Sequence, residues 1–112
     1  LAGLNKANWN DYVDYIKYTN KRILELVDHI LSVSERPPVI ILLGDHGFRH
    51  PFLKTDHQYD FMNLSAVYLP GHNYAGFYDS ISNVNLFRLL FNKGFNQQLP
   101  MLKDSTINVL VD

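Results

Sequence analysis

A run of five apolar residues that ends in two metal-ligand-type side chains constrains this chain more than any other feature. The run is Val39–Leu43, and Asp45 and His46 follow it between Gly44 and Gly47. Its length and its β-branched residues are typical of a buried strand in a parallel sheet, although periodicity alone does not exclude a buried helix turn. Open α/β sheets bind their ligands just past the carboxyl ends of such strands. We therefore expect a ligand site here, at which glycine allows unusual backbone conformations and a close approach.

The strongest helical pattern precedes this run. Apolar residues recur at helical spacing from about Trp9 to Ser34, which predicts one long amphipathic helix. Asn10 is a candidate cap for its start, and Pro37 and Pro38 end it by forcing an extended chain. The expected buried stripe consists of Val13, Ile16, Asn20, Ile23, Leu24, Val27, Ile30 and Leu31. A buried amide needs hydrogen-bond partners, so we expect Asn20 to tie the helix to a neighbouring loop.

A long loop and a second strand follow. No periodic pattern runs from His46 to about Met62, and this stretch carries several charged and histidine side chains. Loops of this length inside compact domains are usually functional or disordered, and its composition favours a functional one. A second strand is expected over Asn63–Leu69, closed by the turn residues Pro70 and Gly71.

The last part of the chain predicts a helix and a strand. The capping residues Ser80–Asn83 precede the helix, Lys93 lies near its end and Gly94 just beyond it. Its expected apolar face consists of Val84, Phe87, Leu90 and Phe91. Alternation from Ile107 to Val111 predicts a final strand. The order helix, strand, strand, helix, strand indicates an α/β fold, in which residues 1–112 form a single domain or a fragment of one.

Composition limits the kind of protein this is. A chain of 112 residues is one domain or a piece of one. Its net charge of −1 argues against nucleic acid as a partner, which needs a concentrated basic surface. The absence of cysteine excludes disulfides and thiolate metal sites. No apolar run can span a bilayer, and the chain begins at Leu1, so we expect a soluble fragment whose exposed strand edges allow self-association.

Asp45 and His46 supply two of the groups that bind divalent metals. A carboxylate oxygen and a neutral imidazole nitrogen are both available near neutral pH. Adjacent residues on a regular strand point to opposite faces, but in a turn between glycines both side chains can approach one ion. Two ligands do not complete a site, which needs three or four. The alternative is structural: Asp45 caps a turn and His46 bonds to the backbone.

The segment Pro37–Gly47 resembles the C-terminal metal motif of the alkaline phosphatase superfamily. It is most similar to the sulfatase-like hydrolases and transferases, in which an apolar strand ends in (Ser/Gly)-Asp-His-Gly. Tyr18–Asn20 and the helix after it resemble the helix before that strand, and Asn63–Gly71 resembles the strand after it. Ser80–Arg88 resembles a helix start of bacterial membrane-associated members. The likeness covers nearly the whole chain, although only Asp-His-Gly carries chemistry.

The resemblance implies the C-terminal part of a catalytic domain, with a partial alkaline-phosphatase-like sheet and flanking helices. In that superfamily the Asp and His of the motif bind zinc, manganese, calcium or magnesium. Asp45 and His46 would then be metal ligands of an enzyme that hydrolyses or transfers a phosphate or sulfate ester. The nucleophile is expected upstream of this chain, which alone should be inactive. The parent is expected at the extracytoplasmic, periplasmic face of a bacterial membrane.

Other side chains are candidates for the same site. His57 is a candidate third metal ligand. Arg49, His50 and His72 are candidates for contact with the anionic ester substrate, since cationic donors bind anionic oxygens. For each of them the alternative is a solvated surface residue. Phe48–Pro51 replaces the glutamate-rich sequence that follows the motif in some phosphoethanolamine transferases, which leaves the substrate class open.

Two rival hypotheses use the same residues. A non-catalytic, degenerate sulfatase-like module for binding or assembly would lack the upstream ligands, and Asp45→Ala in the full-length protein would leave its function intact. An unrelated small α/β domain would not bring the Asp45 and His46 side chains together.

Overall fold

The structure is a computed structural model that describes residues 9–49 and 55–107. It divides into two compact units, Leu1–Gly71 and His72–Asp112. The described residues contain helices and one antiparallel strand pair, which agrees with the expected small α/β structure. Most of the expected final strand, residues 108–111, lies outside the described residues, as does His50.

The first element, α1, spans Trp9–Val33 and confirms the expected long helix. It ends where the Ser34 N–H donates to the Ile30 carbonyl at 3.1 Å. Asp11 lies in its first turn, where a negative charge suits the helix dipole. Asn10 lies inside the helix, so its expected role as the cap is wrong. Among the described residues, no helix is long and apolar enough to cross a bilayer.

The apolar stripe of α1 is only partly covered. The exposed members of the stripe are Val13, Ile16, Leu24 and Leu31. Asn20 is also exposed, so the expected buried amide is wrong. The ring of Tyr12 meets the ring of Phe48 edge-on, with centroids 5.1 Å apart, and joins the start of α1 to the loop after β1. Helical periodicity identifies residues that share a face, but it does not say what covers that face.

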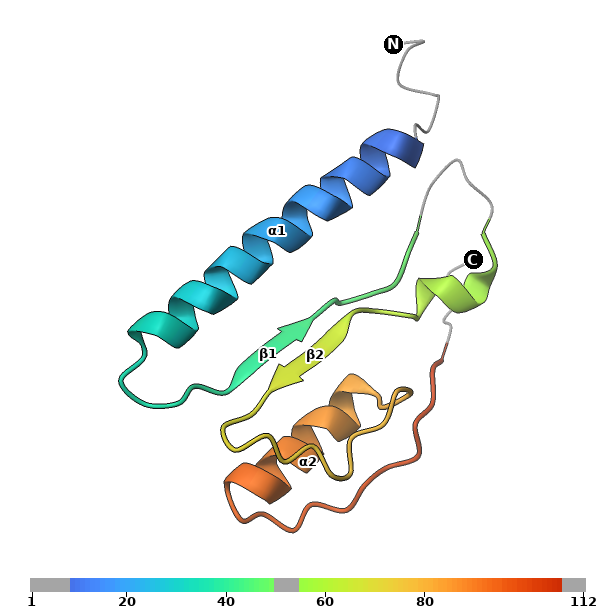
Figure 1. Ribbon diagram of the computed structural model, residues 1–112. Coiled ribbons are helices and arrows are strands. Elements are labelled where there is room, and N and C mark those ends of the chain that lie inside the picture. Colours follow the sequence, from blue (N-terminus) through green and yellow to red (C-terminus); the bar gives the residue numbers. More distant parts are fainter. Residues whose placement is uncertain (1–8, 50–54, 108–112) are drawn as a thin grey trace. The chain divides into compact units, whose positions relative to one another are not determined.

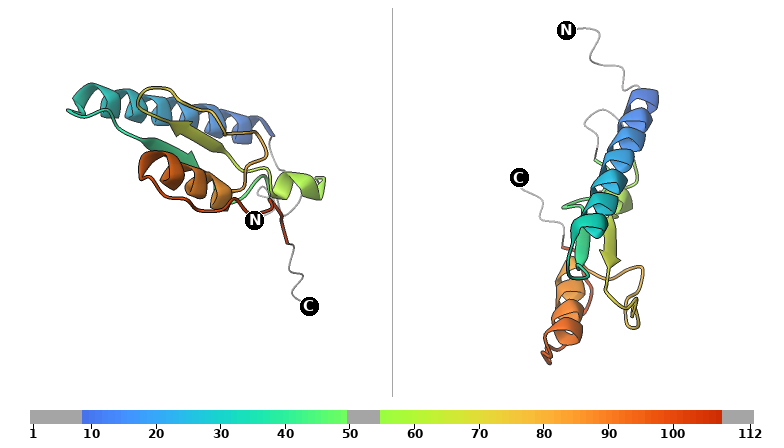
Figure 2. Two further views of the ribbon diagram at one scale, coloured as in Figure 1. Left: turned by 90° about the horizontal axis from the view of Figure 1, so that it is seen from below. Right: turned by 60° about the vertical axis from the view of Figure 1, so that its left-hand side comes forward.

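Two short strands pair within the first unit. β1 spans Ile40–Leu43 and β2 spans Ser65–Tyr68, which confirms both expected strands with narrower bounds. They are antiparallel, with Leu43 opposite Ser65, and lie side by side in Figure 1 and Figure 2. The expectation of a buried strand in a parallel sheet is wrong for the described residues, since β1 pairs antiparallel and Ile41 is exposed. An apolar run carries no information about the direction of its neighbour.

A short 3₁₀ helix, η2, spans His57–Asp60 within the loop that links the strands. Asp56 caps it, because its carboxylate accepts from the Gln58 N–H at 3.1 Å. The chain then leads into β2 and passes the end of β1 (Figure 1). The long loop therefore contains local structure that its sequence pattern does not reveal.

The second unit is built around α2, which spans Asn83–Gly94. The Ser82 hydroxyl caps the helix by accepting from the Asn85 N–H at 3.3 Å, as expected from the capping residues in this stretch. Lys93 lies in the last turn, where a positive charge suits the dipole. Gly94 is the last helical residue instead of the first one beyond the helix.

The face that α2 buries differs from the expected one. Leu86 is 1% exposed and Leu90 is 7% exposed, and Asn85 beside them is fully buried. The members of the expected apolar face that are exposed instead are Val84, Phe87 and Phe91. A buried amide needs hydrogen-bond partners, so Asn85 indicates that a segment with available backbone polar groups covers this face.

That segment is an extended tail, residues 97–104, which runs beside α2 (Figure 1). Asn85 donates to the Leu102 carbonyl at 2.7 Å and accepts from the Leu102 N–H at 2.9 Å. Two turns along the helix, Asn92 donates to the Leu99 carbonyl at 2.9 Å and accepts from the Leu99 N–H at 2.7 Å. The two asparagines therefore bond the main chain of the tail as a neighbouring strand would.

A carboxylate anchors the tail at the start of α2. Asp104 accepts from the Ser82 N–H at 2.8 Å, from the Asn85 amide at 2.8 Å and from the Tyr78 hydroxyl. The bonds from Ser82 and then from Tyr78 hold the pKa of Asp104 well below its usual value of 3.8, because they favour the charged carboxylate. The bond to Asp104 in turn raises the pKa of Tyr78 above its usual 10.0.

We predict that Asp104→Asn destabilises the second unit at neutral pH and that this difference disappears in acid. A carboxyl whose folded-state pKa is lowered stabilises the fold above its unfolded value of 3.8, and this contribution is lost as the pH falls through the folded-state pKa. The measurement is the urea midpoint of the α2 amide signals in NMR spectra at neutral and acidic pH.

Asn92→Ala is the control, because it removes hydrogen bonds to the tail from a side chain that does not titrate. The loss of stability that it causes should be the same at both pH values. A deficit of Asp104→Asn that is equally constant would contradict the prediction.

Candidate metal centre

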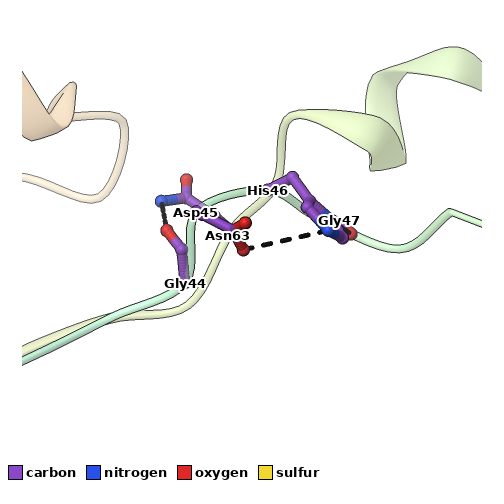
Figure 3. Close-up of polar contacts among 5 residues, drawn as sticks. All are labelled: Gly44, Asp45, His46, Gly47 and Asn63. Atoms are coloured by element: carbon purple, nitrogen blue, oxygen red, sulfur yellow. Dashed lines mark hydrogen bonds and ion pairs between the residues drawn. The ribbon is translucent and has the colours of Figure 1, made fainter.

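Asp45 and His46 lie in the bend that follows β1, beyond the last residue of the strand. Their side chains come together, with Asp45 Oδ1 3.8 Å from His46 Nε2 (Figure 3). A regular strand would place them on opposite faces. The side chain of Asp45 is 92% exposed and that of His46 is 45% exposed. The two groups lie within ion-pair distance of each other, and both are open to solvent.

Three hydrogen bonds form a clamp between this bend and the segment 60–64. The Gly44 N–H donates to the Leu64 carbonyl at 2.8 Å, which extends the strand pairing by one residue. The Asn63 amide donates to the Gly44 carbonyl at 2.7 Å (Figure 3). The Gly47 N–H donates to the Asp60 carbonyl at 2.8 Å. The clamp therefore holds the backbone on both sides of the two ligand-type residues.

The glycines at the two ends of the bend allow this close approach. A Cβ on Gly47 would lie 1.9 Å from the Tyr59 carbonyl oxygen, which is closer than real atoms come. A Cβ on Gly44 would lie 3.3 Å from the Leu64 nitrogen, a tight contact. Neither glycine has a positive φ, so the expected unusual backbone conformation is wrong. Glycine is required at Gly47 because another part of the backbone occupies the space that a side chain would fill.

The backbone also sets the tautomer of His46. Its Nδ1 lies 2.6 Å from the Gly47 carbonyl oxygen. A carbonyl oxygen only accepts hydrogen bonds, so Nδ1 carries the hydrogen. Nε2 of the neutral ring then keeps its lone pair, and Nε2 is the nitrogen that faces Asp45. Metal-binding histidines are commonly oriented in this way, by a bond from their other ring nitrogen to a carbonyl or carboxylate.

The separation of the two ligand atoms suits a shared cation. At 3.8 Å, Asp45 Oδ1 and His46 Nε2 are too far apart for a hydrogen bond. Nitrogen and oxygen ligands lie about 2.0–2.2 Å from zinc, which places two tetrahedral ligands about 3.4 Å apart. A small rotation of the exposed Asp45 carboxylate spans this difference. The pair therefore fits half of a divalent metal site.

The structural alternative, in which Asp45 caps a turn and His46 bonds to the backbone, holds only in part. His46 bonds to the backbone as that alternative requires, but it uses one ring nitrogen and leaves the other available. In the part of the chain that the structure describes, no backbone N–H donates to the Asp45 carboxylate, so Asp45 does not cap the turn there.

No further ligand completes the pair within residues 9–49 and 55–107. These residues contain no group of three or more His, Cys, Asp or Glu side chains that could hold a metal. His57, the candidate third ligand, lies on η2 with its Nδ1 3.2 Å from the Asp60 carboxylate. The structure does not bring it to Asp45 and His46.

The candidate substrate contacts belong to different parts of the chain. Arg49 is exposed, three residues beyond His46 in the same loop. His72 belongs to the second unit, where its ring lies near that of Tyr74 with centroids 6.3 Å apart. His50 lies outside the described residues.

Sequence reasoning missed Asn63 and Asp60, two of the residues that form the clamp. Asn63 is recognisable in the sequence only as the first residue of the expected strand. Its role depends on the register of β1 and β2, which places the residues before β2 beside the glycine that ends β1. Without the strand pairing, no local signal distinguishes this asparagine from a turn residue.

Comparisons with known proteins give no assignment, since no protein-family model matches the chain and no curated protein or solved structure is significantly similar to it. The resemblance to sulfatase-like proteins therefore depends on the residues of the chain itself.

We predict that Gly47→Ala opens the clamp. The added methyl group would meet backbone atoms, so the chain must shift, at a cost of about 1–3 kcal/mol in the free energy of unfolding. Gly94→Ala is the control, because a Cβ there meets nothing within 4 Å and alanine favours the helix by up to about 1 kcal/mol. Urea unfolding compares both variants with the original chain. Equal stability of the two variants would contradict the steric role of Gly47.

Proposed function

We propose that this chain is the metal-binding, C-terminal portion of a sulfatase-like catalytic domain that hydrolyses or transfers phosphate or sulfate esters. The observation that supports this proposal is the geometry of the Asp45–His46 pair. Nδ1 of His46 is bonded to a carbonyl, and Nε2 faces the carboxylate at 3.8 Å. The motif Pro37–Gly47 links this geometry to the superfamily by resemblance.

In this proposal Asp45 and His46 hold zinc, manganese, calcium or magnesium. Their role is to bind the ion and not to transfer protons, because the carboxylate and Nε2 serve as ligands. When bound, the ion acts as a Lewis acid that stabilises negative charge on the transferring phosphoryl or sulfuryl group. The nucleophile and the remaining ligands come from another part of the parent protein. This chain alone is expected to be inactive.

The proposed substrate is an anionic ester. Arg49 is exposed close to the pair in sequence, and a guanidinium binds phosphate or sulfate oxygens through paired hydrogen bonds. For His50 and His72, contact with this substrate stays a prediction from the sequence alone. We also propose that the parent works at the extracytoplasmic face of a membrane, as the resemblance implies.

The rival proposal is a degenerate module used for binding or assembly. Two features are compatible with it: the described residues supply only two ligands, and α1 exposes part of its apolar stripe. It predicts no metal-dependent chemistry, so the experiments below separate the two proposals.

We predict that the chain binds a divalent metal weakly through the pair. Mn²⁺ should broaden the NMR amide signals of the bend, and Asp45→Ala or His46→Ala should each abolish this effect, since a single ligand does not hold the ion. Asp79→Ala and His29→Ala change an exposed aspartate and an exposed histidine and should leave it intact. Broadening of the bend that survives both Asp45→Ala and His46→Ala would contradict the assignment.

We predict that the full-length parent cleaves an aryl phosphate or aryl sulfate only with metal. Asp45→Ala should lower kcat/KM by at least about 100-fold, because outer-shell changes alone cost about 10–100-fold. Asp79→Ala should retain activity. A parent that hydrolyses neither ester with any of the four metals, and whose function survives Asp45→Ala, would favour the degenerate module.

A further inference from the structure

We propose that Asn63 is a positioning residue for the Asp45–His46 pair and controls metal affinity without touching the ion. The inference rests on the proposed function. Asn63 lies just before β2, and its amide Nδ2 donates to the Gly44 carbonyl at 2.7 Å in a partly buried contact (Figure 3).

The bond acts on the peptide group that carries Asp45. The Gly44 carbonyl and the Asp45 nitrogen belong to one planar unit, so holding the carbonyl oxygen fixes the orientation of that plane. The Asp45 carboxylate is 92% exposed, so packing does not aim it. The backbone that Asn63 holds therefore fixes the point from which the Asp45 side chain starts.

His46 has a separate support. Its Nδ1 is bonded to the Gly47 carbonyl, and the Gly47 N–H is bonded to the Asp60 carbonyl. The Gly44 N–H keeps its bond to Leu64, so loss of the Asn63 bond would loosen only the peptide group between Gly44 and Asp45, while the support of His46 remains. The separation of the two ligand atoms would then vary, and the ion would lose a preorganised pair.

Asn63 is also the one residue whose side chain makes a hydrogen bond of the clamp. The other two bonds join main-chain atoms only, from Gly44 to Leu64 and from Gly47 to Asp60. The Asn63 side chain thus offers a direct test of whether the clamp sets the geometry of the metal pair.

Two substitutions separate positioning from charge. Asn63→Ala removes the donor. Asn63→Asp keeps the shape, removes the donor and adds a negative charge near the pair. Charge alone would tighten the binding of a cation by the Asn63→Asp variant, because opposite charges attract. Loss of positioning would weaken metal binding in both variants. Whether Asn63→Asp binds the metal more weakly or more tightly than the original chain therefore separates positioning from charge.

The experiment is a Mn²⁺ titration of the full chain, with amide broadening in the bend as the readout. We expect affinity about 10-fold lower in Asn63→Ala and in Asn63→Asp, the lower end of losses seen for outer-shell partners of metal sites. Asn92→Ala is the matched control, because it removes an asparagine that bonds to main chain in the other unit. Its affinity should be unchanged.

Unchanged affinity in Asn63→Ala, or tighter binding by Asn63→Asp, would overturn the inference while leaving the metal pair intact. If the original chain shows no broadening at residues 44–47, the proposed metal half-site itself fails. The chemical shifts of β1 and β2 report whether each variant keeps the strand pair.

If Asn63→Ala loses the pairing of β1 with β2, the role of Asn63 is tested on the original chain instead. Zn²⁺ binding should then shift the side-chain amide signal of Asn63, since coupling between two sites is reciprocal. An unmoved Asn63 signal at saturating Zn²⁺ would overturn the inference.

Discussion

The contact between the Gly44–Gly47 bend and the segment 60–64 is the interaction on which the first unit depends. A pair of four-residue strands is marginally stable by itself. The clamp adds three hydrogen bonds beyond the end of β1, and it can form because Gly47 has no side chain where the Tyr59 carbonyl passes. The bonds that complete the strand pair are thus the same bonds that place Asp45 and His46. Stability of the unit and geometry of the candidate centre are therefore linked.

Local patterns predicted the elements of this chain better than its pairings. The periodicity of α1, the Ser82 cap and the convergence of Asp45 with His46 all depend on neighbours in sequence. The direction of β2 and the buried face of α2 do not. Asn63 and Gly44 are 19 residues apart, and Asn85 and Leu102 are 17 apart. Such contacts require the fold, because propensity and periodicity describe only a short window of chain.

Asparagine has the same structural use in both units. An amide side chain carries one carbonyl acceptor and an NH₂ donor, so it can replace a peptide group as a hydrogen-bond partner. Asn85 and Asn92 each satisfy both polar atoms of one tail residue, and Asn63 satisfies the carbonyl of Gly44. Backbone groups taken out of water must be paired. In the tail, which pairs with no strand among the described residues, side chains of the adjacent helix therefore hold the main chain in a defined position.

The openness of the Asp45–His46 pair bears on the kind of metal chemistry that it suits. Structural metal sites enclose the ion with four protein ligands, and their binding energy contributes to folding. Here hydrogen bonds between protein groups already hold the bend, and the Asp45 and His46 side chains are 92% and 45% exposed. An ion bound by this pair would keep coordination positions for ligands from elsewhere and for a substrate oxygen. Under the proposed function, this openness is what a Lewis-acid centre requires and a structural site does not.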